Sequence, residues 1–142
     1  GIGTGPATWY GAIRILTNQG DLSNMEVSSS FLNLHARSEL EGSATVIKVF
    51  EDSNDDGIIN AGQDEVFTTK LPIIADGEWH RMNLPLSNLA LDLSGNNTSV
   101  NGGVLDLEKA LRIDITVSQL GTSDGTFGFD VDYVILTPDF PF

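Results

Sequence analysis

Short runs of alternating apolar and polar residues, separated by clusters of turn-forming residues, extend along the whole chain. The runs are rich in Val, Ile, Thr and Phe, and Gly, Asn, Asp and Ser fill the segments between them. Such a pattern is typical of β-sandwiches and β-barrels, whereas almost no segment has the period of a helix. The sequence therefore predicts an all-β protein of seven or eight strands, which short connections pair in antiparallel fashion.

The pattern also predicts where the strands lie and which residues face the core. Strands are expected over residues 9–16, 26–37, 43–50, 66–73, 78–86, 111–117 and 127–136, with one helical turn at 106–110. In the second strand, Leu32, Leu34 and Ala36 share one face, which we expect to be the core face. In the last strand, strict alternation puts Tyr133 on the same face as Val131.

The most distinctive stretch of the sequence is an acidic one in its first half. Asp52, Asn54 and Asp56 stand at every second position, and Gly57 follows the third of them. Ca²⁺ takes about six to eight oxygen ligands, and a D-x-N-x-D-G run wraps three side-chain oxygens around the ion. The backbone carbonyl of Ile58 can supply another. We therefore expect a calcium loop.

The sequence leaves the closing ligand of this loop open. An EF-hand closes with a bidentate Glu at its twelfth position, but that position is the neutral Gln63 here. Asp64 or Glu65 supplies the closing carboxylate if Gly62 lets the chain bulge, and Asn60 is a further candidate. Strand-forming sequence flanks the loop on both sides, so we expect a calcium-clipped β-hairpin at one end of the sandwich, with the ion serving folding alone.

A solvated acidic turn is the alternative for this stretch, because Asp, Asn and Gly favour turns by themselves. Five carboxylates fall within residues 52–65, and no lysine or arginine lies among them. Such a cluster repels itself unless a cation lies between its members. The composition of the stretch therefore favours the calcium loop.

Length and charge narrow the class of protein. A chain of 142 residues suits one core, so we expect a single domain over residues 1–142, with ends that look like the linkers of a module. The lack of cysteine excludes disulfides and thiolate chemistry. The net charge of −13 argues against nucleic acid or an anionic membrane as a partner, because both require clustered cations.

No catalytic constellation stands out in the sequence. It contains no nucleophile-elbow, phosphate-loop or dinucleotide motif. His35 and His80 are too few to propose a zinc site, and no pair of carboxylates can be assigned to glycoside hydrolysis. We therefore expect a non-catalytic protein.

Three segments in the second half of the chain resemble one family. Residues 78–87 contain W-x-x-x-x-x-P-L, residues 106–115 contain D-L-x-x-x-x-x-I-x-I, and residues 131–136 read V-D-Y-V-I-L. In this order they resemble strands of jelly-roll carbohydrate-binding modules of the galactose-binding-like superfamily, which are appended to secreted glycoside hydrolases and polysaccharide lyases. The similarity spans residues 76–138. The D-x-N-x-D-G loop is similar to loops of secreted bacterial adhesins and glycan-acting proteins.

This resemblance implies a jelly-roll β-sandwich that binds carbohydrate. It implies that Trp79 packs beneath the sheet, and that a strand precedes Trp9, although the glycine-rich start does not supply an obvious one. Sugar-binding sites stack an aromatic side chain on the apolar face of a pyranose and bond its hydroxyls with amide, carboxylate and guanidinium groups. Exposed aromatic residues are therefore required, and the candidates are Trp9, Tyr10, Phe31, Phe50 and Trp79, with a core position favoured for Trp9 and Trp79.

Further candidates for sugar binding follow from the strand faces. Phe31, Asn33, His35 and Arg37 alternate with the core residues of their strand and make the best single patch. If this strand lies mid-sheet, residues of other strands would line the same face, namely Tyr10, Arg14, Lys48, Arg81 and Arg112. A basic cleft in an acidic protein favours an anionic polysaccharide, such as a uronate or a sulfated glycan.

Cross-strand ion pairing is the alternative for these cations, with Asp114, Asp130 and Asp132 as partners. It would favour a calcium-rigidified structural or adhesin spacer without a sugar site, and a small polysaccharide-acting enzyme is a third reading. Our leading expectation is a monomeric, calcium-stabilised carbohydrate-binding module of a multidomain protein. Since such a calcium loop fills at extracellular calcium concentrations, we expect it to be secreted or displayed on a bacterial surface.

Overall fold

Two antiparallel sheets stacked face to face make up the protein in a computed structural model. The backbone is described for residues 2–4, 9–39, 43–119 and 126–141, and the side chains for residues 12–39, 45–117 and 129–141. The strands in this part are β1 (Ile2–Thr4), β2 (Trp9–Leu16), β3 (Phe31–Ser38), β4 (Ser43–Glu51), β5 (Glu65–Pro72), β6 (His80–Pro85), β7 (Ala90–Leu91), β8 (Ala110–Gln119) and β9 (Thr126–Thr137). Two 3₁₀ helices, η1 (Leu86–Asn88) and η2 (Leu107–Lys109), accompany them.

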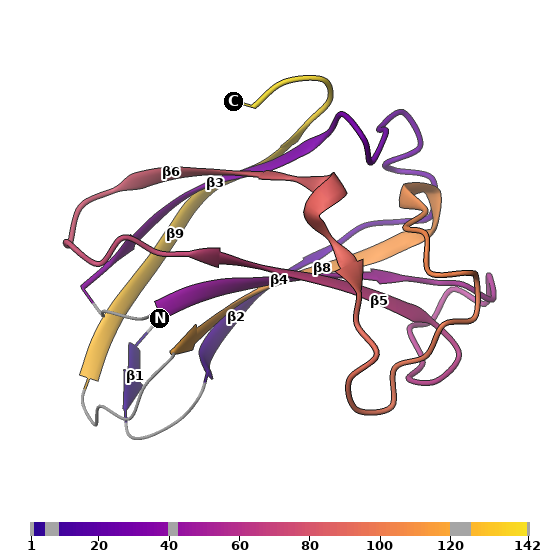
Figure 1. The fold of residues 1–142 in the computed structure, drawn as a ribbon, viewed down its shortest axis with the longest axis horizontal. Helices are drawn as coiled ribbons and strands as arrows, with labels where there is room; N and C mark the ends of the chain where they lie inside the picture. Colours follow the sequence, from indigo (N-terminus) through magenta and orange to yellow (C-terminus); the bar gives the residue numbers. More distant parts are fainter. Residues whose placement is uncertain (1, 5–8, 40–42, 120–125, 142) are drawn as a thin grey trace.

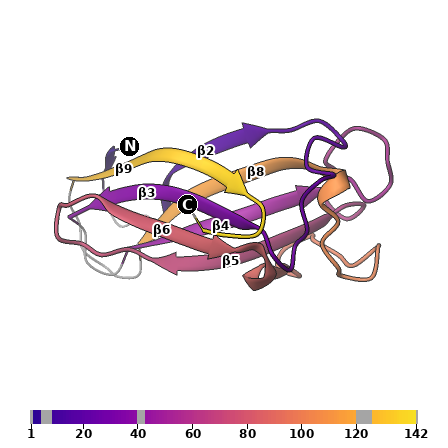
Figure 2. The same ribbon diagram turned by 90° about the horizontal axis from the view of Figure 1, so that it is seen from above.

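The strand order defines the two layers of the sandwich. One sheet has the order β1-β9-β3-β6, and the other has the order β2-β8-β4-β5-β7. Every pairing is antiparallel. Figure 1 looks into the edge at which β6 of one sheet lies above β5 of the other, and Figure 2 looks down through both layers. The predicted all-β antiparallel sandwich is confirmed.

Alternation along each strand decides which side chains fill the space between the sheets. The expectation that Leu32, Leu34 and Ala36 face the core is confirmed. Other strands contribute the buried residues Ile47, Val49, Phe67, Leu84, Ile113, Ile115 and Val117. Each large apolar side chain contributes about 1.5–3 kcal/mol on burial. The intervening residues point to the two outer faces of the sandwich, which are the surfaces that a ligand can reach.

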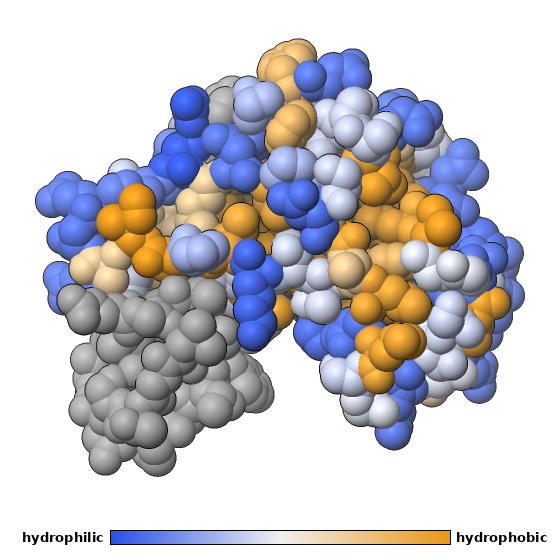
Figure 3. Space-filling model, viewed as in Figure 1, coloured by the Kyte–Doolittle hydropathy of each residue, from blue (hydrophilic) through white to orange (hydrophobic). Residues whose placement is uncertain are grey.

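The space between the sheets opens along the edge formed by β5 and β6. Apolar atoms show there in a band across the space-filling view (Figure 3). Pro72, Ile73 and Met82 help to line a cavity of about 240 Å³ at this edge. The opening belongs to the rim of the core and to neither outer face.

Two strands lie where the sequence has no alternating pattern. β1 precedes Trp9 and pairs with β9, so the strand that the resemblance implies is present. β7 lies within residues 87–103, which read as a long polar loop, and it pairs with β5. These strands have three and two residues. They form because an existing sheet edge offers unpaired backbone groups. Their own side chains show no alternation from which a strand could be predicted.

A bulge in β9 breaks the predicted alternation of the last strand. The register between β3 and β9 shifts between Asn33 and His35, where β9 has one residue more than β3. Tyr133 lies in this bulge with a φ of 53°. Beyond it Val134 packs against the core, whereas Tyr133 is 60% exposed. The expectation that Tyr133 shares the face of Val131 is therefore wrong, because one inserted residue reverses the faces of a strand.

The hairpin predicted around the acidic stretch is formed by β4 and β5. Their ladder ends at the pair Glu51–Glu65, and residues 52–64 connect the two strands. Both glutamates are buried, as are the neighbouring Asp52 and Asp64. Because buried carboxylates require hydrogen-bond partners, this connection has to be a specifically folded loop.

The predicted helical turn at residues 106–110 is confirmed as η2. Asp106 caps it, since its side chain accepts a hydrogen bond from the backbone N–H of Glu108 at 3.0 Å. Among the residues that the structure describes, no helix is long and apolar enough to cross a membrane.

Candidate functional site

The cations predicted to bind sugar divide between the two outer faces of the sandwich. Arg14, Lys48 and Arg112 lie on β2, β4 and β8 of the five-stranded sheet, whereas Arg37 and Arg81 lie on β3 and β6 of the four-stranded sheet. The expectation of one shared face is therefore wrong. Alternation identifies the outward residues of each strand, but only the topology decides to which sheet a strand belongs.

Cross-strand register gathers one group of residues on the five-stranded sheet. Asp114 of β8 stands opposite Arg14 of β2 on one side and opposite Lys48 of β4 on the other. Two positions earlier on β8, Arg112 stands opposite Phe50 of β4. We call Arg14, Lys48, Phe50, Arg112 and Asp114 the arginine face.

The guanidinium of Arg112 lies over an aromatic ring. Its guanidinium carbon is 3.4 Å from the centre of the Phe50 ring, a stacked cation–π arrangement. Its Nε lies 3.4 Å from Oδ2 of Asp114 but lacks hydrogen-bond geometry. Burial lowers the pKa of the Arg112 guanidinium, the charge of Asp114 raises it, and the charge of Arg14 lowers it again. Arginine remains charged under such shifts. The guanidinium of Arg112 is therefore a charged group of hydrogen-bond donors positioned over Phe50.

The other two cations of the arginine face have acidic partners. Arg14 donates two hydrogen bonds to the carboxylate of Asp114, at 3.0 and 3.3 Å, and these raise the pKa of its guanidinium. Lys48 donates from Nζ to Oδ2 of Asp92 at 2.7 Å. The predicted pairing with Asp114 is thus confirmed for Arg14. Counting Arg14, Lys48 and Arg112 against Asp92 and Asp114 leaves this region with one positive charge in excess.

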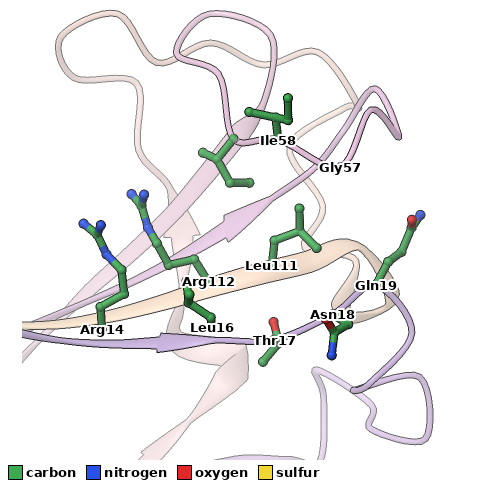
Figure 4. Close-up of a pocket in the computed structure, with 10 residues that line it drawn as sticks. Arg14, Leu16, Thr17, Asn18, Gln19, Gly57, Ile58, Leu111 and Arg112 are labelled. Carbon is green, nitrogen blue, oxygen red and sulfur yellow. The ribbon is translucent and has the colours of Figure 1, made fainter.

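A cavity of about 590 Å³ opens beside the arginine face. Arg14 and Arg112 line one side of it, and residues 17–19 and 57–59 line the others. In Figure 4 both arginine side chains project from the sheet toward the side on which Ile58 lies. Residues 57–59 of the acidic loop therefore form a wall of this cavity, whereas the sequence predicts that an ion in the loop serves folding alone.

Asp52 anchors the beginning of the acidic loop. Its two carboxylate oxygens accept hydrogen bonds from the backbone N–H groups of Asp56 at 3.2 Å and Gly57 at 2.7 Å. The chain turns here through the left-handed region, with a φ of 60° at Asp55 and 80° at Gly57. Glycine adopts that region without steric cost, which is the role that the motif predicts for Gly57.

Side-chain amides converge on the acceptors of the loop. Asn60 donates from Nδ2 to Oδ2 of Asp56 and to the carbonyl of Ile58, at 3.3 and 3.4 Å. Asn54 donates from Nδ2 to the same Asp56 oxygen and to Oε1 of Gln63, both at 3.2 Å. Rotating the Asn60 amide by half a turn would present its oxygen in place of its nitrogen, whereas the oxygen of Asn54 accepts from the backbone N–H of Asp56 at 3.2 Å. The loop thus brings together carboxylate, amide and carbonyl oxygens, which are the ligand atoms that Ca²⁺ prefers. Asn60 and Gln63 belong to this group of residues.

Asp64 and Glu65, the predicted closing ligands, have other partners. Asp64 accepts hydrogen bonds from the backbone N–H groups of Ser53 at 2.9 Å and Asn60 at 2.6 Å. Oε1 of Glu65 accepts from three backbone N–H groups and one hydroxyl within residues 99–103. Asp64 therefore closes the loop on itself, and Glu65 ties the base of the hairpin to residues 99–103.

Glu51 lies beside Glu65 and is also buried. It accepts hydrogen bonds from the backbone N–H of Asp106 at 2.9 Å and the amide of Asn101 at 3.2 Å. Burial raises the pKa of Glu51, these hydrogen bonds lower it, and the charge of Glu65 raises it, with a net upward shift. Oε2 of Glu65 has no hydrogen-bond partner among the described residues. Burial and the neighbouring carboxylate therefore favour the protonated form of Glu51.

Clusters of metal-binding side chains are sparse. In the part of the chain that the structure describes, no three side chains of His, Asp or Glu converge closely enough to hold a metal ion. A cation in the acidic loop would therefore depend on amide and carbonyl oxygens in addition to carboxylates.

The outer face of the four-stranded sheet carries exposed aromatic side chains. Trp79 is 46% exposed, and the guanidinium carbon of Arg37 lies 5.1 Å from the centre of its ring. Arg37 also forms an ion pair with Asp130, as predicted for a cross-strand pair. The ring centres of His35 and Tyr133 are 5.6 Å apart. We call His35, Arg37, Trp79, Asp130 and Tyr133 the aromatic face.

The turn before β6 carries Trp79 outward. Gly77 donates its backbone N–H to the carbonyl of Ser38 at 3.0 Å, which fixes the turn against the end of β3. Asp76 accepts a hydrogen bond from the ring of His80 at 2.8 Å, and this bond lowers the pKa of Asp76. Trp79 precedes the first residue of β6, so the alternation of that strand does not bury it. The expectation that Trp79 packs beneath the sheet is therefore wrong.

Asn33, a predicted sugar ligand, is 1% exposed. Its amide donates to the hydroxyl of Thr137 at 2.8 Å and the carbonyl of Ile135 at 3.3 Å, and its oxygen accepts from Asn83 at 2.6 Å. These bonds hold β3 between β6 and β9, which corrects the expectation that Asn33 faces a ligand.

The other predicted sugar ligands occupy varied positions. Phe31 is partly buried, and Arg81 is exposed opposite His35. The side chain of Tyr10 lies outside the described residues. Sequence reasoning weighed Phe50 only as an aromatic candidate, although its alternation with the core residues of β4 predicts an outward position. Tyr133 carried no usable signal, because nothing in the sequence announces the bulge.

No protein-family model and no curated protein matches this sequence. Among solved structures, the chain is similar to the family 11 carbohydrate-binding module of the cellulosomal cellulase Lic26A-Cel5E of Clostridium thermocellum. The TM-score is 0.62 at 18% identity, over 92% of this chain and 67% of that chain. It is also similar to a family 11 module from Clostridium thermocellum in complex with a β-1,3-1,4-mixed-linked tetrasaccharide. There the TM-score is 0.63 at 18% identity, over 92% and 69% of the two chains. Identity this low shows a common fold.

Proposed function

We propose that this chain is a non-catalytic carbohydrate-binding module that holds a polysaccharide on its arginine face. The observation that carries the proposal is Arg112, stacked on Phe50 beside Asp114 at a cavity of about 590 Å³. The guanidinium that Phe50 supports and the carboxylate of Asp114 offer hydrogen-bonding groups, and Leu16, Ile58 and Leu111 supply apolar contacts in the same cavity. Both similar structures are carbohydrate-binding modules, and one of them holds a tetrasaccharide, which supports the same role here.

An anionic polysaccharide is the ligand class that we propose for the arginine face. Arg14 and Arg112 share the single carboxylate of Asp114, so a carboxylate or sulfate on the ligand would complete the pairing. Guanidinium groups bind such oxyanions through paired donors. A uronate polymer is therefore expected to bind this face more tightly than an uncharged polymer of similar length.

We also propose that the acidic loop binds Ca²⁺, with Asp52, Asn54, Asp56, the carbonyl of Ile58, Asn60 and Gln63 as the candidate oxygen donors. Support comes from the convergence of Asn54 and Asn60 on acceptors of the loop. A bound ion would replace these amide contacts and stiffen the segment 57–59 that walls the cavity. Calcium would then act on sugar binding through the shape of that wall.

The natural context that we propose is a module of a larger protein. Carbohydrate-binding modules of this fold act beside catalytic domains, as in the cellulosomal cellulase to which one similar structure belongs. We infer that this chain directs a secreted or surface protein, such as a glycoside hydrolase or polysaccharide lyase, to its polysaccharide.

A spacer or adhesin domain without a sugar site is the second candidate function. It is favoured by the ion pairs Arg14–Asp114, Lys48–Asp92 and Arg37–Asp130, which neutralise most outward cations on their own sheets. In such a domain the charged side chains would serve pairing between strands, and neither outer face would hold a ligand.

Affinity electrophoresis and titration calorimetry against uronate, sulfated and neutral polysaccharides separate the two functions. Wild-type chain is expected to bind a uronate polymer, and Arg112→Ala or Phe50→Ala to weaken binding about tenfold or more. Thr116→Ala is the matched control, because Thr116 lies on the same strand beyond Asp114 and touches neither Arg112 nor Phe50 across the register. If the wild-type chain is retained by no polysaccharide, the spacer function stands and the proposal fails.

A further inference from the structure

We propose a second carbohydrate-binding site on the aromatic face, on the opposite side of the sandwich, that takes a neutral glycan. The site combines Trp79 and Tyr133 as stacking surfaces with His35, Arg37 and Asp130 as hydrogen-bonding groups. It goes beyond the function proposed for the arginine face, because it uses the other sheet and a different class of ligand.

Two exposed aromatic rings flank the same strand. Single exposed apolar side chains are normal on a protein surface, but Trp79 and Tyr133 contact consecutive outward residues of β3. Trp79 contacts Arg37 and Tyr133 contacts His35, and two strand positions cover about 7 Å. The rings and the polar groups between them therefore form one continuous surface.

The backbone is distorted where it presents Tyr133. A non-glycine residue with a φ of 53° is strained. Because the Tyr133 side chain is mostly exposed, the free energy gained by burying it offsets little of that strain. Bulges of this kind turn a side chain to a new direction beside functional sites. Without this bulge, Tyr133 would lie on the core side of β9, as strict alternation predicts.

A small cavity beside Trp79 supplies polar groups. It has a volume of about 240 Å³ and is lined by Arg37, Ser38, Glu39, Gly77 and Asp130. A Cβ atom at Gly77 would approach the side chain of Glu39 to 3.5 Å, and Gly77 has a φ of 81°. That contact is an ordinary one, so the positive φ is what favours glycine at this point of the cavity wall. Carboxylate and guanidinium groups at this spacing suit the hydroxyls of a sugar stacked on Trp79.

Charge distinguishes this site from the arginine face. Arg37 is paired with Asp130, and Glu39 adds a negative charge at the cavity. On either side of His35, Arg81 of β6 is offset by Asp132 of β9. The site therefore has no excess of positive charge with which to attract a uronate. A neutral hexose or pentose chain, whose rings have apolar faces, is the ligand that these groups would recognise.

Tryptophan fluorescence tests this site directly, because the chain has only two tryptophans. In a Trp9→Phe background Trp79 is the single reporter. Neutral mixed-linkage β-glucan, xylan and mannan are titrated, and protection of the emission from acrylamide is measured. Saturable protection by at least one neutral polymer is expected, and Tyr133→Ala should weaken that binding about tenfold. Polygalacturonate should give no protection.

Variants of the two faces distinguish failure of this inference from failure of the proposed function. In affinity electrophoresis, which needs no tryptophan, Phe50→Ala with Arg112→Ala should leave neutral-glycan binding unchanged, whereas Trp79→Ala should abolish it and preserve uronate binding. Val104→Ala is the control for loss of an exposed apolar side chain elsewhere, and unfolding curves verify that each variant is folded. Absence of protection by every neutral polymer, with a wild-type chain that still binds uronate, would overturn the second site alone.

Discussion

At the scale of the residue, partners decide the behaviour of the charged side chains more than exposure does. Lys48 faces solvent on β4, yet its partner is Asp92, a buried carboxylate after β7. Glu51 occupies a core-facing position at the end of the same strand and has no cationic partner in the described structure. The pKa values of Asp92 and Glu51 are therefore shifted in opposite directions. Each shift predicts how the stability of the fold changes with pH.

Asp92 is expected to stabilise the fold at neutral pH. Burial raises its pKa, but hydrogen bonds from Lys48 and from Ser94 outweigh burial and lower the pKa from 3.8 to about 2. Because the folded pKa lies below the unfolded one, the stabilisation is present above about pH 4 and is lost as the pH falls toward 2. Asp92→Asn should cost about 2 kcal/mol at pH 7, measured by urea unfolding.

The difference between wild type and Asp92→Asn should shrink steadily between pH 4 and pH 2. Asp139→Asn removes an exposed aspartate near the end of the chain and serves as the control. A constant difference across this range would contradict the proposed role of the Lys48–Asp92 pair.

Glu51 is expected to have the opposite effect. Because its pKa is raised in the folded protein, the folded state holds the proton more tightly than the unfolded chain. Stability is then greatest below the unfolded pKa of 4.5 and falls as the pH rises through the folded pKa. Glu51→Gln should therefore raise the melting temperature at pH 7 and remove this part of the pH dependence. Equal or lower stability of the variant at pH 7 would show that Glu51 is better satisfied as an anion.

At the scale of the element, the hairpin of β4 and β5 and the bulge of β9 carry the features that matter for function. The hairpin places the acidic loop beside Arg14 and Arg112. The bulge places Tyr133 beside His35. Both are departures from regular strand geometry, so each can be tested by a pair of substitutions that differ in one physical property.

Calcium should stabilise the hairpin through Asp56 and not through its neighbour. The carboxylate of Asp55 accepts hydrogen bonds from Gln19 at 2.8 Å and Lys109 at 3.0 Å. It is therefore not one of the candidate calcium ligands of the loop. Calcium should raise the melting temperature of wild type and Asp55→Asn alike. Asp56→Asn should require about tenfold more calcium for the same rise, since it loses a charged oxygen ligand.

Thermal unfolding in calcium and in excess chelator provides the measurement for this pair. Asparagine is tolerated at the left-handed position of Asp55, so the control substitution adds no strain. Identical melting temperatures of the wild-type chain in calcium and in chelator would leave the acidic loop as a solvated turn closed by its own hydrogen bonds.

The bulge should make glycine better than alanine at position 133. In a regular strand glycine is less stable than alanine by about 0.5–1 kcal/mol. At the left-handed φ of Tyr133, alanine retains the strain and glycine relieves it, so Tyr133→Gly should be about 1 kcal/mol more stable than Tyr133→Ala. Urea unfolding of the two variants decides this. The usual order, with alanine more stable, would mean that the bulge relaxes when the tyrosine is removed.

At the scale of the whole molecule, the sandwich separates two chemically different surfaces. The arginine face belongs to the five-stranded sheet and the aromatic face to the four-stranded sheet, and the two sheets form separate layers (Figure 1). A ligand on one face therefore has no contact with the other. Two sites fixed on opposite sides of a rigid body can join two polymers without any linker.

Bridging between polymers is the corresponding prediction. The module should carry soluble polygalacturonate into the pellet of an insoluble neutral glycan, because each polymer occupies its own face. Co-sedimentation measures this transfer, which should disappear with Arg112→Ala and equally with Trp79→Ala. Transfer that persists in either variant would mean that both polymers compete for a single face.

Much of the fold could be predicted because strand periodicity is a local property. The inward positions of β3, β4 and β8 and the hairpin around the acidic loop all follow from alternation and turn chemistry within a few residues. The residues of the acidic loop follow in the same way. Arg14 and its pairing with Asp114 were also foreseeable, since both occupy outward positions of strands.

What the sequence by itself determined is the outward or inward direction of side chains in the regular parts of the strands, because backbone geometry repeats every two residues there. Only the tertiary structure decided which outward residues meet, because sheet membership depends on contacts between distant segments. The tertiary structure places Arg37 and Arg112 on different sheets. It buries Asn33 among partners from β6 and β9. It also turns Tyr133 to solvent through a bulge, and the pairing of β9 with β3 on both sides of the bulge offsets the strain.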